Sequence, residues 1–263
     1  VILPLRQKLN LYANIRPAKV CPNVPNSRAG VDLVIVRENT EDLYKRLEDG
    51  SDEWGVAVRT ITKKASERIA KAAFELARKE GRKKVTCVHK ANVLTVTCGL
   101  FKRACQEVSR QYPDIEFNDM YVDACALKLV MNPKAFDVIV TTNLFGDILS
   151  DLAAGLVGGL GMAPSGNLGD DFAIFEPVHG SAPDIAGKSI ANPSATILSA
   201  KMMLDWLGEH RAAEVLEEAL IQVLKEGKIL TPDLGGKAKT YEMAEAVSQK
   251  IKTPHRHSTV LAL

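Results

Sequence analysis

The chain has 263 residues, of which 46% are hydrophobic and 25% charged, a composition typical of a globular protein with a sizeable core. Its 34 basic and 32 acidic residues give a formal net charge of +2 and form neither a basic arm nor an acidic tail. This balance disfavours nucleic acid as a partner. No apolar run reaches the roughly 18 residues of a membrane-spanning helix, because glycines interrupt the stretch at 152–162.

The cysteines and the start of the chain indicate the compartment. The five cysteines are odd in number and show no CxxC spacing, which is typical of free thiols in a reducing environment. The chain begins with Val1 and enters helix-like sequence without a signal or transit peptide. We expect a soluble intracellular protein, cytoplasmic or in a mitochondrial matrix if eukaryotic, with further sequence upstream.

The first predicted elements are a strand and a hairpin. Residues 31–36 are β-branched and apolar without polar alternation, as in a strand buried on both faces. Residues 43–60 break this pattern with mixed charge and two glycines. The alternation of Val56 and Val58 within them predicts a hairpin arm.

A helix and two strands follow. Apolar residues recur at helical spacing over about 66–80, and Gly81 supplies a left-handed stop. Residues 85–88 and 137–142 repeat the pattern of a buried strand. This alternation predicts an α/β architecture, in which the loops at the strand ends carry the chemistry.

The last part of the chain is predicted to be mainly helical. Glycines at 155–169 suggest a hinge or domain crossing. A helix is expected after Asn192, a candidate cap, with Met203 on its inward face, and another over about 212–225. The tail at 254–263 has no periodicity and is expected to fray.

Two aspartates are candidate metal ligands. Asp147 and Asp151 follow a predicted buried strand, and their spacing of four places both on one helix face, where they can share Mg²⁺ or Mn²⁺. We expect Gly146 to make the turn and Asp147 to lie in the first helical turn, where an aspartate is also common without a metal. Asp123 ends another strand-like run and is either a third ligand or a helix cap.

Three arginines are candidates for binding an acidic substrate. Arg37 lies in a dense polar cluster at 36–44, where its guanidinium group can bind a carboxylate with two hydrogen bonds. Arg6 and Arg16 would then suit an acid with several carboxylates. The alternatives are structural ion pairs in a polar turn and ordinary surface charges.

Two side chains are candidates for proton transfer. Tyr44 offers a phenol as a proton donor. Lys90 lies at the mouth of the strand at 85–88, where a lysine near cations or a metal can lose its proton and act as a base. A solvated surface lysine is the alternative.

A segment rich in small residues, 176–187, is a candidate nucleotide site. Its small side chains let backbone amides approach a phosphate, and Asp184 suits an unphosphorylated ribose while repelling a 2′-phosphate. No GxGxxG motif is present in the chain, so a standard Rossmann site is not supported.

These stretches, in this order, resemble the β-decarboxylating dehydrogenases that act on isocitrate, homoisocitrate, 3-isopropylmalate and tartrate. The resemblance extends from about Leu5 to Ala246. It implies a two-domain, non-Rossmann α/β fold like that of isopropylmalate dehydrogenase. The large cofactor-binding domain would consist of 1–11 and 158–263, and the small domain, 12–157, would hold the metal site and a hairpin clasp at the dimer interface.

The resemblance also implies roles for individual residues. Substrate carboxylates would be bound by Arg6, Arg16 and Arg37, and the metal by Asp123, Asp147 and Asp151. Tyr44, Lys90 and Asp123 would be catalytic, with Lys90 and Asp123 entering the neighbouring subunit's site. Cofactor contacts would come from Asn92, Glu176, His179, Gly180, Ser181, Ala182, Asp184, Ile185 and Asn192.

The activity implied is NAD-dependent oxidative decarboxylation of a malate-type 2-hydroxy acid. Asp184-Ile185 matches the NAD-using members, and Lys45-Arg46 and Ile2 are similar to homoisocitrate dehydrogenase, with isocitrate the next substrate. The alternatives are 3-isopropylmalate, tartrate and a noncatalytic regulatory subunit of NAD-isocitrate dehydrogenase. Family members carry a first strand, helices and a glycine-rich turn before the segment where this chain starts, so we expect that part of the large domain to be missing.

Overall fold

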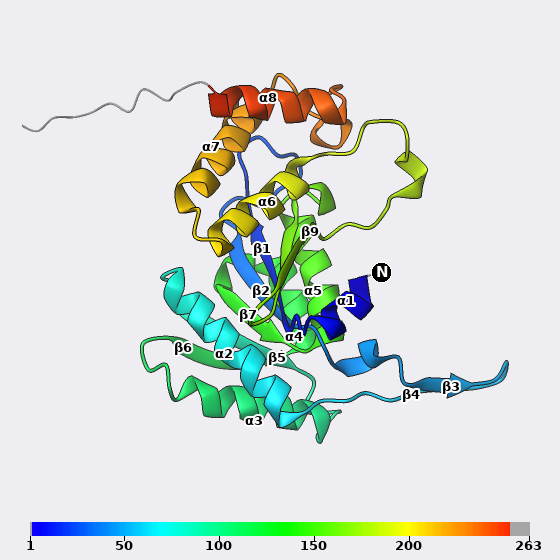
Figure 1. Ribbon diagram of the computed structural model, residues 1–263. Helices are drawn as coiled ribbons and strands as arrows, with labels where there is room; N and C mark the ends of the chain where they lie inside the picture. The colour runs from blue at the N-terminus through cyan, green and yellow to red at the C-terminus, as the bar shows by residue number, and fades with distance from the viewer. Residues whose placement is uncertain (1, 253–263) are drawn as a thin grey trace, which may run out of the picture.

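The protein is described from a computed structural model over residues 2–252. Within them, seven strands form one sheet, in the order β6-β5-β7-β2-β1-β8-β9, and two form a separate hairpin, β3-β4 (Figure 1). The strands are β1 Ala13–Lys19, β2 Asp32–Glu38, β3 Glu48–Gly50, β4 Gly55–Ala57, β5 Lys84–His89, β6 Glu116–Tyr121, β7 Val138–Thr141, β8 Pro164–Leu168 and β9 Ala173–Pro177.

Eight α-helices accompany these strands in the described part of the chain. They are α1 Ile2–Lys8, α2 Lys63–Lys79, α3 Thr97–Ser109, α4 Val122–Met131, α5 Asn143–Leu156, α6 Ser194–Trp206, α7 His210–Glu226 and α8 Thr240–Lys252. Short 3₁₀ helices include η1 Asp42–Lys45 and η4 Pro183–Ile185. No helix between residues 2 and 252 is long and apolar enough to cross a bilayer.

Helices cover both faces of the central strands, which explains the lack of polar alternation in their sequence. Val34 and Val36 of β2 pack with α2 and α3, through residues such as Phe74. Leu33 and Ile35 of the same strand point to the opposite face and pack with α4 and α5. Because successive side chains of a strand point to opposite faces, one apolar run contributes to two cores.

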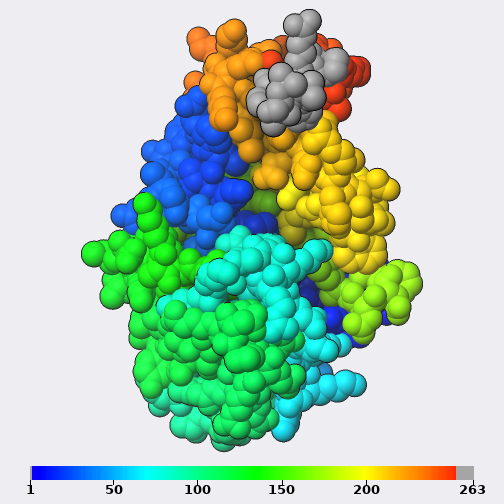
Figure 2. All heavy atoms as spheres, turned by 90° about the vertical axis from the view of Figure 1, so that its left-hand side faces the viewer, coloured from blue at the N-terminus to red at the C-terminus, as the bar shows by residue number. Residues whose placement is uncertain are grey.

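A third core lies at one end of the sheet, where α6, α7 and α8 gather (Figure 1). Val24, in the loop after β1, packs into this core, and Asn23 donates a hydrogen bond to the Leu224 carbonyl at 3.2 Å. Figure 2 shows this blue loop lying against the orange helix α7. The early loop thus attaches the C-terminal helices to the sheet.

The strand directions place the polar residues that end several strands at one edge of the sheet. β6, β5, β7 and β2 run parallel, so Glu38, His89 and Thr141 lie at the carboxyl ends of neighbouring strands. β1 is antiparallel to both β2 and β8, and β9 is antiparallel to β8. The strands and helices that follow one another in sequence thus form the expected α/β fold.

Most predicted elements are confirmed. The buried strand patterns correspond to β2, β5 and β7, the hairpin arm to β3 and β4, and the helix ending before Gly227 to α7. Helix α2 begins at Lys63, earlier than expected, because the Thr62 hydroxyl accepts a hydrogen bond from the Ala65 N–H at 3.2 Å and caps it. The hairpin projects from the body of the molecule (Figure 1).

Two local expectations are wrong. Helix α5 begins at Asn143, so Gly146 does not make a turn but lies inside the helix, and Asp147 lies beyond its first turn. Met203, expected to face inward, is 40% exposed. The glycine-rich stretch at 155–169 contains the strand β8, and its role as a hinge or domain crossing stays a prediction. The tail at 254–263 lies outside the described residues. Strands β8 and β9 extend the sheet that contains β1, and the division into two domains stays a prediction.

A glycine is required at position 146 because β2 approaches α5 closely there and leaves no room for a side chain. Its backbone angles are not the reason. A Cβ atom at this position would lie 2.6 Å from Arg37 Cγ and 2.7 Å from Arg37 Cβ, whereas one at Gly155 of the same helix would meet open space. We expect Gly146→Ala to lower the free energy of unfolding by about 1–3 kcal/mol through overpacking. Gly155→Ala should raise it by about 0.5–1 kcal/mol. Urea unfolding measures both, and equal effects of the two changes would contradict the packing argument.

Candidate active site

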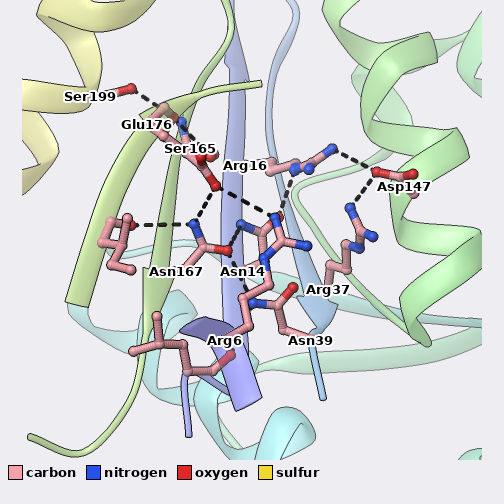
Figure 3. Close-up of polar contacts among 12 residues, drawn as sticks. Arg6, Asn14, Arg16, Arg37, Asn39, Asp147, Ser165, Asn167, Glu176 and Ser199 are labelled. Atoms are coloured by element: carbon pink, nitrogen blue, oxygen red, sulfur yellow. Dashed lines mark hydrogen bonds and ion pairs between the residues drawn. The ribbon is translucent and has the colours of Figure 1, made fainter. Parts of the chain in front are cut away.

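Three buried arginines lie beside the centre of the sheet, and two of them, Arg16 and Arg37, contact Asp147 (Figure 3). Arg6 comes from α1, Arg16 from β1 and Arg37 from β2. Asp147 and Asp151 lie one turn apart on α5. The strand register places Arg16 opposite Ile35, so Arg16 and Arg37 lie two residues apart on adjacent strands.

Asp147 is the centre of this group. Its Oδ1 accepts hydrogen bonds from Arg37 Nη1 and, at 3.2 Å, from Arg16 Nη1, while its Oδ2 accepts one from the Tyr44 hydroxyl at 2.5 Å. Burial acts to raise the pKa of Asp147, but Arg37, the bond from Tyr44 and Arg16 outweigh it and lower that pKa. Asp147 is therefore ionised at neutral pH.

Asp151 is held less tightly. Its Oδ1 lies 3.6 Å from Arg16 Nη1, and the side chain is 57% exposed. Burial raises its pKa, and the neighbouring charge of Asp147 adds to this, although Arg16 opposes it. A second carboxylate one turn from an ionised one is an arrangement that a hard divalent cation stabilises.

The arginines carry donors without protein partners. Arg37 Nε donates to the Asn143 side-chain oxygen at 2.9 Å, but the buried Arg37 Nη2 and Arg6 Nε have no partner among the described residues. Buried donors without acceptors are costly, so an anionic ligand fits here. Burial and then the charge of Arg37 lower the pKa of Arg16 to about 10, which still leaves Arg16 a cation at neutral pH.

Buried asparagines, which the sequence analysis missed, orient this group. Asn14 accepts from Arg16 Nε at 2.6 Å and donates to the Asn167 oxygen at 2.9 Å. Asn39 donates to the same oxygen at 3.0 Å, and Asn167 donates to Glu176 Oε1 at 2.9 Å. The available signal was polar residues inside strands, with Asn14 and Arg16 two apart on β1.

Glu176, a predicted cofactor contact, lies in the group that contains Arg6 and Asn167, and its contact with a cofactor stays a prediction. Its Oε1 is 3.5 Å from Arg6 Nη2 (Figure 3). The dense polar cluster of residues 36–44 divides in two. Arg37 and Tyr44 face Asp147, whereas the buried Glu38 accepts hydrogen bonds from the Thr40 and Glu41 backbone at 2.8 and 2.9 Å. Glu38 therefore has a structural role, and the binding of a substrate carboxylate by Arg37 stays a prediction.

Lys90 and Asp123 form a second pair at the other side of the sheet. Lys90 Nζ lies 2.5 Å from Asp123 Oδ1, and Asp123 is 65% exposed. Asp123 lies in the first turn of α4 rather than at the end of β6, which ends at Tyr121. The hydrogen bond from Lys90 lowers the pKa of Asp123.

One chain does not bring Asp123 to the other two aspartates. Among residues 2–252 no three acidic, histidine or cysteine side chains are grouped so that they could hold a metal ion. Asp147 and Asp151 alone supply two hard oxygen donors. A three-carboxylate site would need Asp123 from another copy of the chain.

The imidazole of His89, next to Lys90, is fixed by its neighbours. His89 Nδ1 accepts the Ala91 N–H at 3.1 Å, so Nε2 carries the proton and donates to Asp119 Oδ2 at 2.9 Å. Lys102 also donates to this oxygen, at 2.8 Å. These bonds fix the conformation of the turn that carries Lys90.

The predicted cofactor residues are spread over two regions. His179, Gly180, Ser181, Ala182, Asp184 and Ile185 lie in a largely exposed loop around η4. No acceptor is present for the backbone N–H groups of Gly180 and Ser181 within the described residues, so this loop has donors available for a phosphate. Asn92 is also exposed but follows β5, which four other strands separate from β9.

Asn192 has a structural role in this chain. Its side-chain oxygen accepts the Ser194 N–H at 2.9 Å, but the cap residue of α6 is Pro193, one position later than predicted. Its amide donates to Asp233 Oδ2 at 2.9 Å. A cofactor contact from Asn192 stays a prediction.

Asp147→Asn should destabilise the fold in a pH-dependent way. At neutral pH we expect a loss of about 1–3 kcal/mol in the free energy of unfolding, because buried Arg37 loses its anion while Asp147 itself is partly exposed. The pKa of Asp147 is lower in the folded than in the unfolded protein, so the ionised carboxylate stabilises the fold at a pH above the unfolded-state pKa. This stabilisation disappears as the pH falls through the folded-state pKa. The gap between parent and variant should therefore close in acid. Urea unfolding from pH 7 downward measures it, with exposed Asp52→Asn as the control, and a gap that is independent of pH would contradict the assignment.

Known proteins resemble the chain over most of its length. A family model described as isocitrate/isopropylmalate dehydrogenase matches residues 1–247. The isocitrate/homoisocitrate dehydrogenase of Thermus thermophilus is 60% identical, over 95% of this chain and 74% of the relative. The 3-isopropylmalate dehydrogenase of Archaeoglobus fulgidus is 58% identical, over 94% and 76%.

A solved structure agrees with these matches. The crystal structure of isocitrate dehydrogenase from Methylococcus capsulatus superposes with a TM-score of 0.93 at 51% identity, covering 96% of this chain and 77% of that one. Sequence and structure therefore show that the chain belongs to the isocitrate/isopropylmalate dehydrogenase family.

Proposed function

We propose that the protein catalyses the NAD-dependent oxidative decarboxylation of a malate-type 2-hydroxy acid, homoisocitrate first and isocitrate next, with Mg²⁺ or Mn²⁺. The observation that carries this proposal is the convergence of two buried guanidinium groups, of Arg16 and Arg37, and a phenol on Asp147, one helical turn from Asp151. A third buried guanidinium group, of Arg6, lies nearby against Glu176. The cations fit an acid with several carboxylates, and the aspartates fit a hard metal ion. The chain is similar to relatives named for homoisocitrate, isocitrate and isopropylmalate. The stretch at 37–44 resembles the homoisocitrate and isocitrate enzymes more than the isopropylmalate enzymes, and Lys45-Arg46 and Ile2 favour homoisocitrate.

The chain's own residues would bind the acid and move its protons. Arg6, Arg16 and Arg37 bind carboxylates, with Asp147 and Asp151 released from the arginines to hold the cation. When bound, the cation polarises the substrate oxygen and the nicotinamide accepts a hydride. Lys90 takes the hydroxyl proton.

Tyr44 would supply the proton that replaces carbon dioxide on the substrate carbon. Burial and then the hydrogen bond to Asp147 raise its pKa above the usual value of a phenol. The side chain therefore keeps its proton at neutral pH until a carbanion-like centre is close enough to accept it. The free backbone donors around Gly180 would hold the cofactor phosphates, with Asp184 at the ribose, which favours NAD over NADP.

A second copy of the chain would complete each site. Lys90 and Asp123 lie at the other side of the sheet from Arg6, so within one copy they form a separate exposed pair. Beside them α4 and α5 expose Leu127, Val130, Met131 and Ile148. An exposed apolar surface of this kind fits a dimer interface, and the projecting hairpin would clasp the partner.

The substrate is tested by NADH formation. We expect turnover with homoisocitrate and Mg²⁺ to exceed that with isocitrate, with 3-isopropylmalate the poorest, and NAD to be preferred to NADP. The same assay without divalent cation should show almost none, because two adjacent carboxylates then remain paired with arginines. Preference for 3-isopropylmalate would overturn the substrate, and absence of turnover with every acid would favour a regulatory subunit.

Sharing of sites is tested by mixing two inactive variants. Asp147→Asn and Lys90→Ala damage different halves of the proposed site, so mixed dimers keep one intact site. After subunit exchange, we expect about a quarter of the parental activity. Asp147→Asn mixed with Tyr44→Phe is the matched control and should recover none, because both residues lie in the same half. Equal recovery, or none in either mixture despite proven exchange, would contradict sharing.

A further inference from the structure

A buried ion pair lies at the base of the hairpin arm, outside the arginine and aspartate group around Asp147. Asp42 is fully buried, and its oxygens accept hydrogen bonds from Arg59 Nε at 2.6 Å and from Arg59 Nη2 at 3.2 Å. Asp42 begins η1, and Arg59 follows β4 on the return side of the arm. We call these two residues the Asp42–Arg59 clamp.

The clamp attaches the arm to the start of α5. Asp42 Oδ2 also accepts the Leu144 N–H at 3.1 Å, and Arg59 Nη2 donates to the Thr142 hydroxyl at 2.8 Å. The guanidinium group of Arg59 stacks on the Phe145 ring at 4.7 Å. Three contacts thus join the clamp to the cap residue and the first turn of the helix that carries Asp147.

The clamp also fixes the backbone conformation of the segment that leads to Tyr44. Asp42 adopts a left-handed conformation with φ of 70°, which is unfavourable for a side chain other than glycine. Its own Oδ1 accepts the next N–H, that of Leu43, at 3.0 Å, and its backbone N–H donates to the Thr60 carbonyl at 2.9 Å. Tyr44, two residues later, then reaches Asp147 and lies under the Arg37 guanidinium at 4.9 Å.

We propose that Asp42 and Arg59 are positioning residues, which hold the Tyr44 phenol against Asp147 by fixing η1 to the start of α5. Their role for catalysis rests on the proposed function of Tyr44. The clamp contacts both elements: η1, which carries the Tyr44 phenol, and α5, which carries the Asp147 carboxylate. Proton donors need placement within a fraction of an ångström, so a relaxed clamp affects turnover more than substrate binding.

The main test is a double-mutant cycle in the full chain. Asp42→Asn should lower kcat about 10- to 100-fold with a smaller change in KM, because the phenol is displaced from its acceptor. In a Tyr44→Phe background, the same change should lower the residual kcat less than about twofold, since the group it positions is already absent. Equal factors in both backgrounds would show a merely structural role and overturn the proposal.

A matched control comes from a similar pair on the surface. Arg78 makes two hydrogen bonds with Asp114, at 3.1 and 2.5 Å, and stacks on Tyr112 at 4.6 Å, far from Tyr44 in sequence and exposed to solvent. Asp114→Asn should leave kcat within about twofold of the parent. If Asp42→Asn fails to fold, Arg59→Lys takes its place in the cycle, because it keeps the positive charge but loses the fork that contacts both Asp42 and Thr142.

A second readout does not depend on turnover. In protein labelled with ¹³C at the tyrosine ring, the Tyr44 resonance, assigned by its loss in Tyr44→Phe, reports the hydrogen bond to Asp147. Breaking the clamp should shift it toward the value of a solvated tyrosine, while Asp114→Asn leaves it in place. An unshifted Tyr44 resonance would overturn positioning. If the parent shows no turnover but this shift is observed, the proposed function is refuted, and the inference that the clamp positions Tyr44 still holds.

Discussion

The carboxylate of Asp147 between two buried guanidinium groups is the interaction on which the site depends. Arg16 and Arg37 are almost fully removed from water, and burying such cations costs several kcal/mol unless an anion and further hydrogen bonds compensate. Asp147 supplies the anion, and Asn14 and Asn143 supply acceptors for the Nε groups of Arg16 and Arg37. Helix α5 must therefore dock closely on β2, and it does so because no side chain at Gly146 separates them.

The sheet explains why residues far apart in the chain share this site. Asn14 and Asn167 are 153 positions apart but meet because β1 pairs with β8, with these two residues opposite each other. The parallel strands β2, β5 and β7 end in Glu38, His89 and Thr141, and β1 begins at the same edge, where Ala13 pairs with Glu38. The candidate site extends from this edge along β1, and the Asp42–Arg59 clamp attaches the projecting arm to the same edge.

Local patterns were read correctly where one element decides the outcome. The runs that became β2, β5 and β7 are apolar without alternation, and the four-residue spacing of Asp147 and Asp151 needs only a helix to place them on one face. Expectations failed where the outcome depends on how one element packs against another. The sequence predicts a turn at Gly146, but the close approach of a strand requires its missing side chain, and Met203 has the helical spacing of a core residue yet is 40% exposed.

The sequence by itself determined most types of element, the arginines, tyrosine and aspartates that are candidates for the chemistry, and a family that the comparisons confirmed. Only the tertiary structure decided which of them meet. It placed Glu176 beside Arg6, joined Asn14, Asn39 and Asn167, and left Asp123 with Lys90 at the other side of the sheet. The physical reason is that periodicity encodes the face of an element, whereas contacts between distant segments depend on strand order and register, which no local pattern contains.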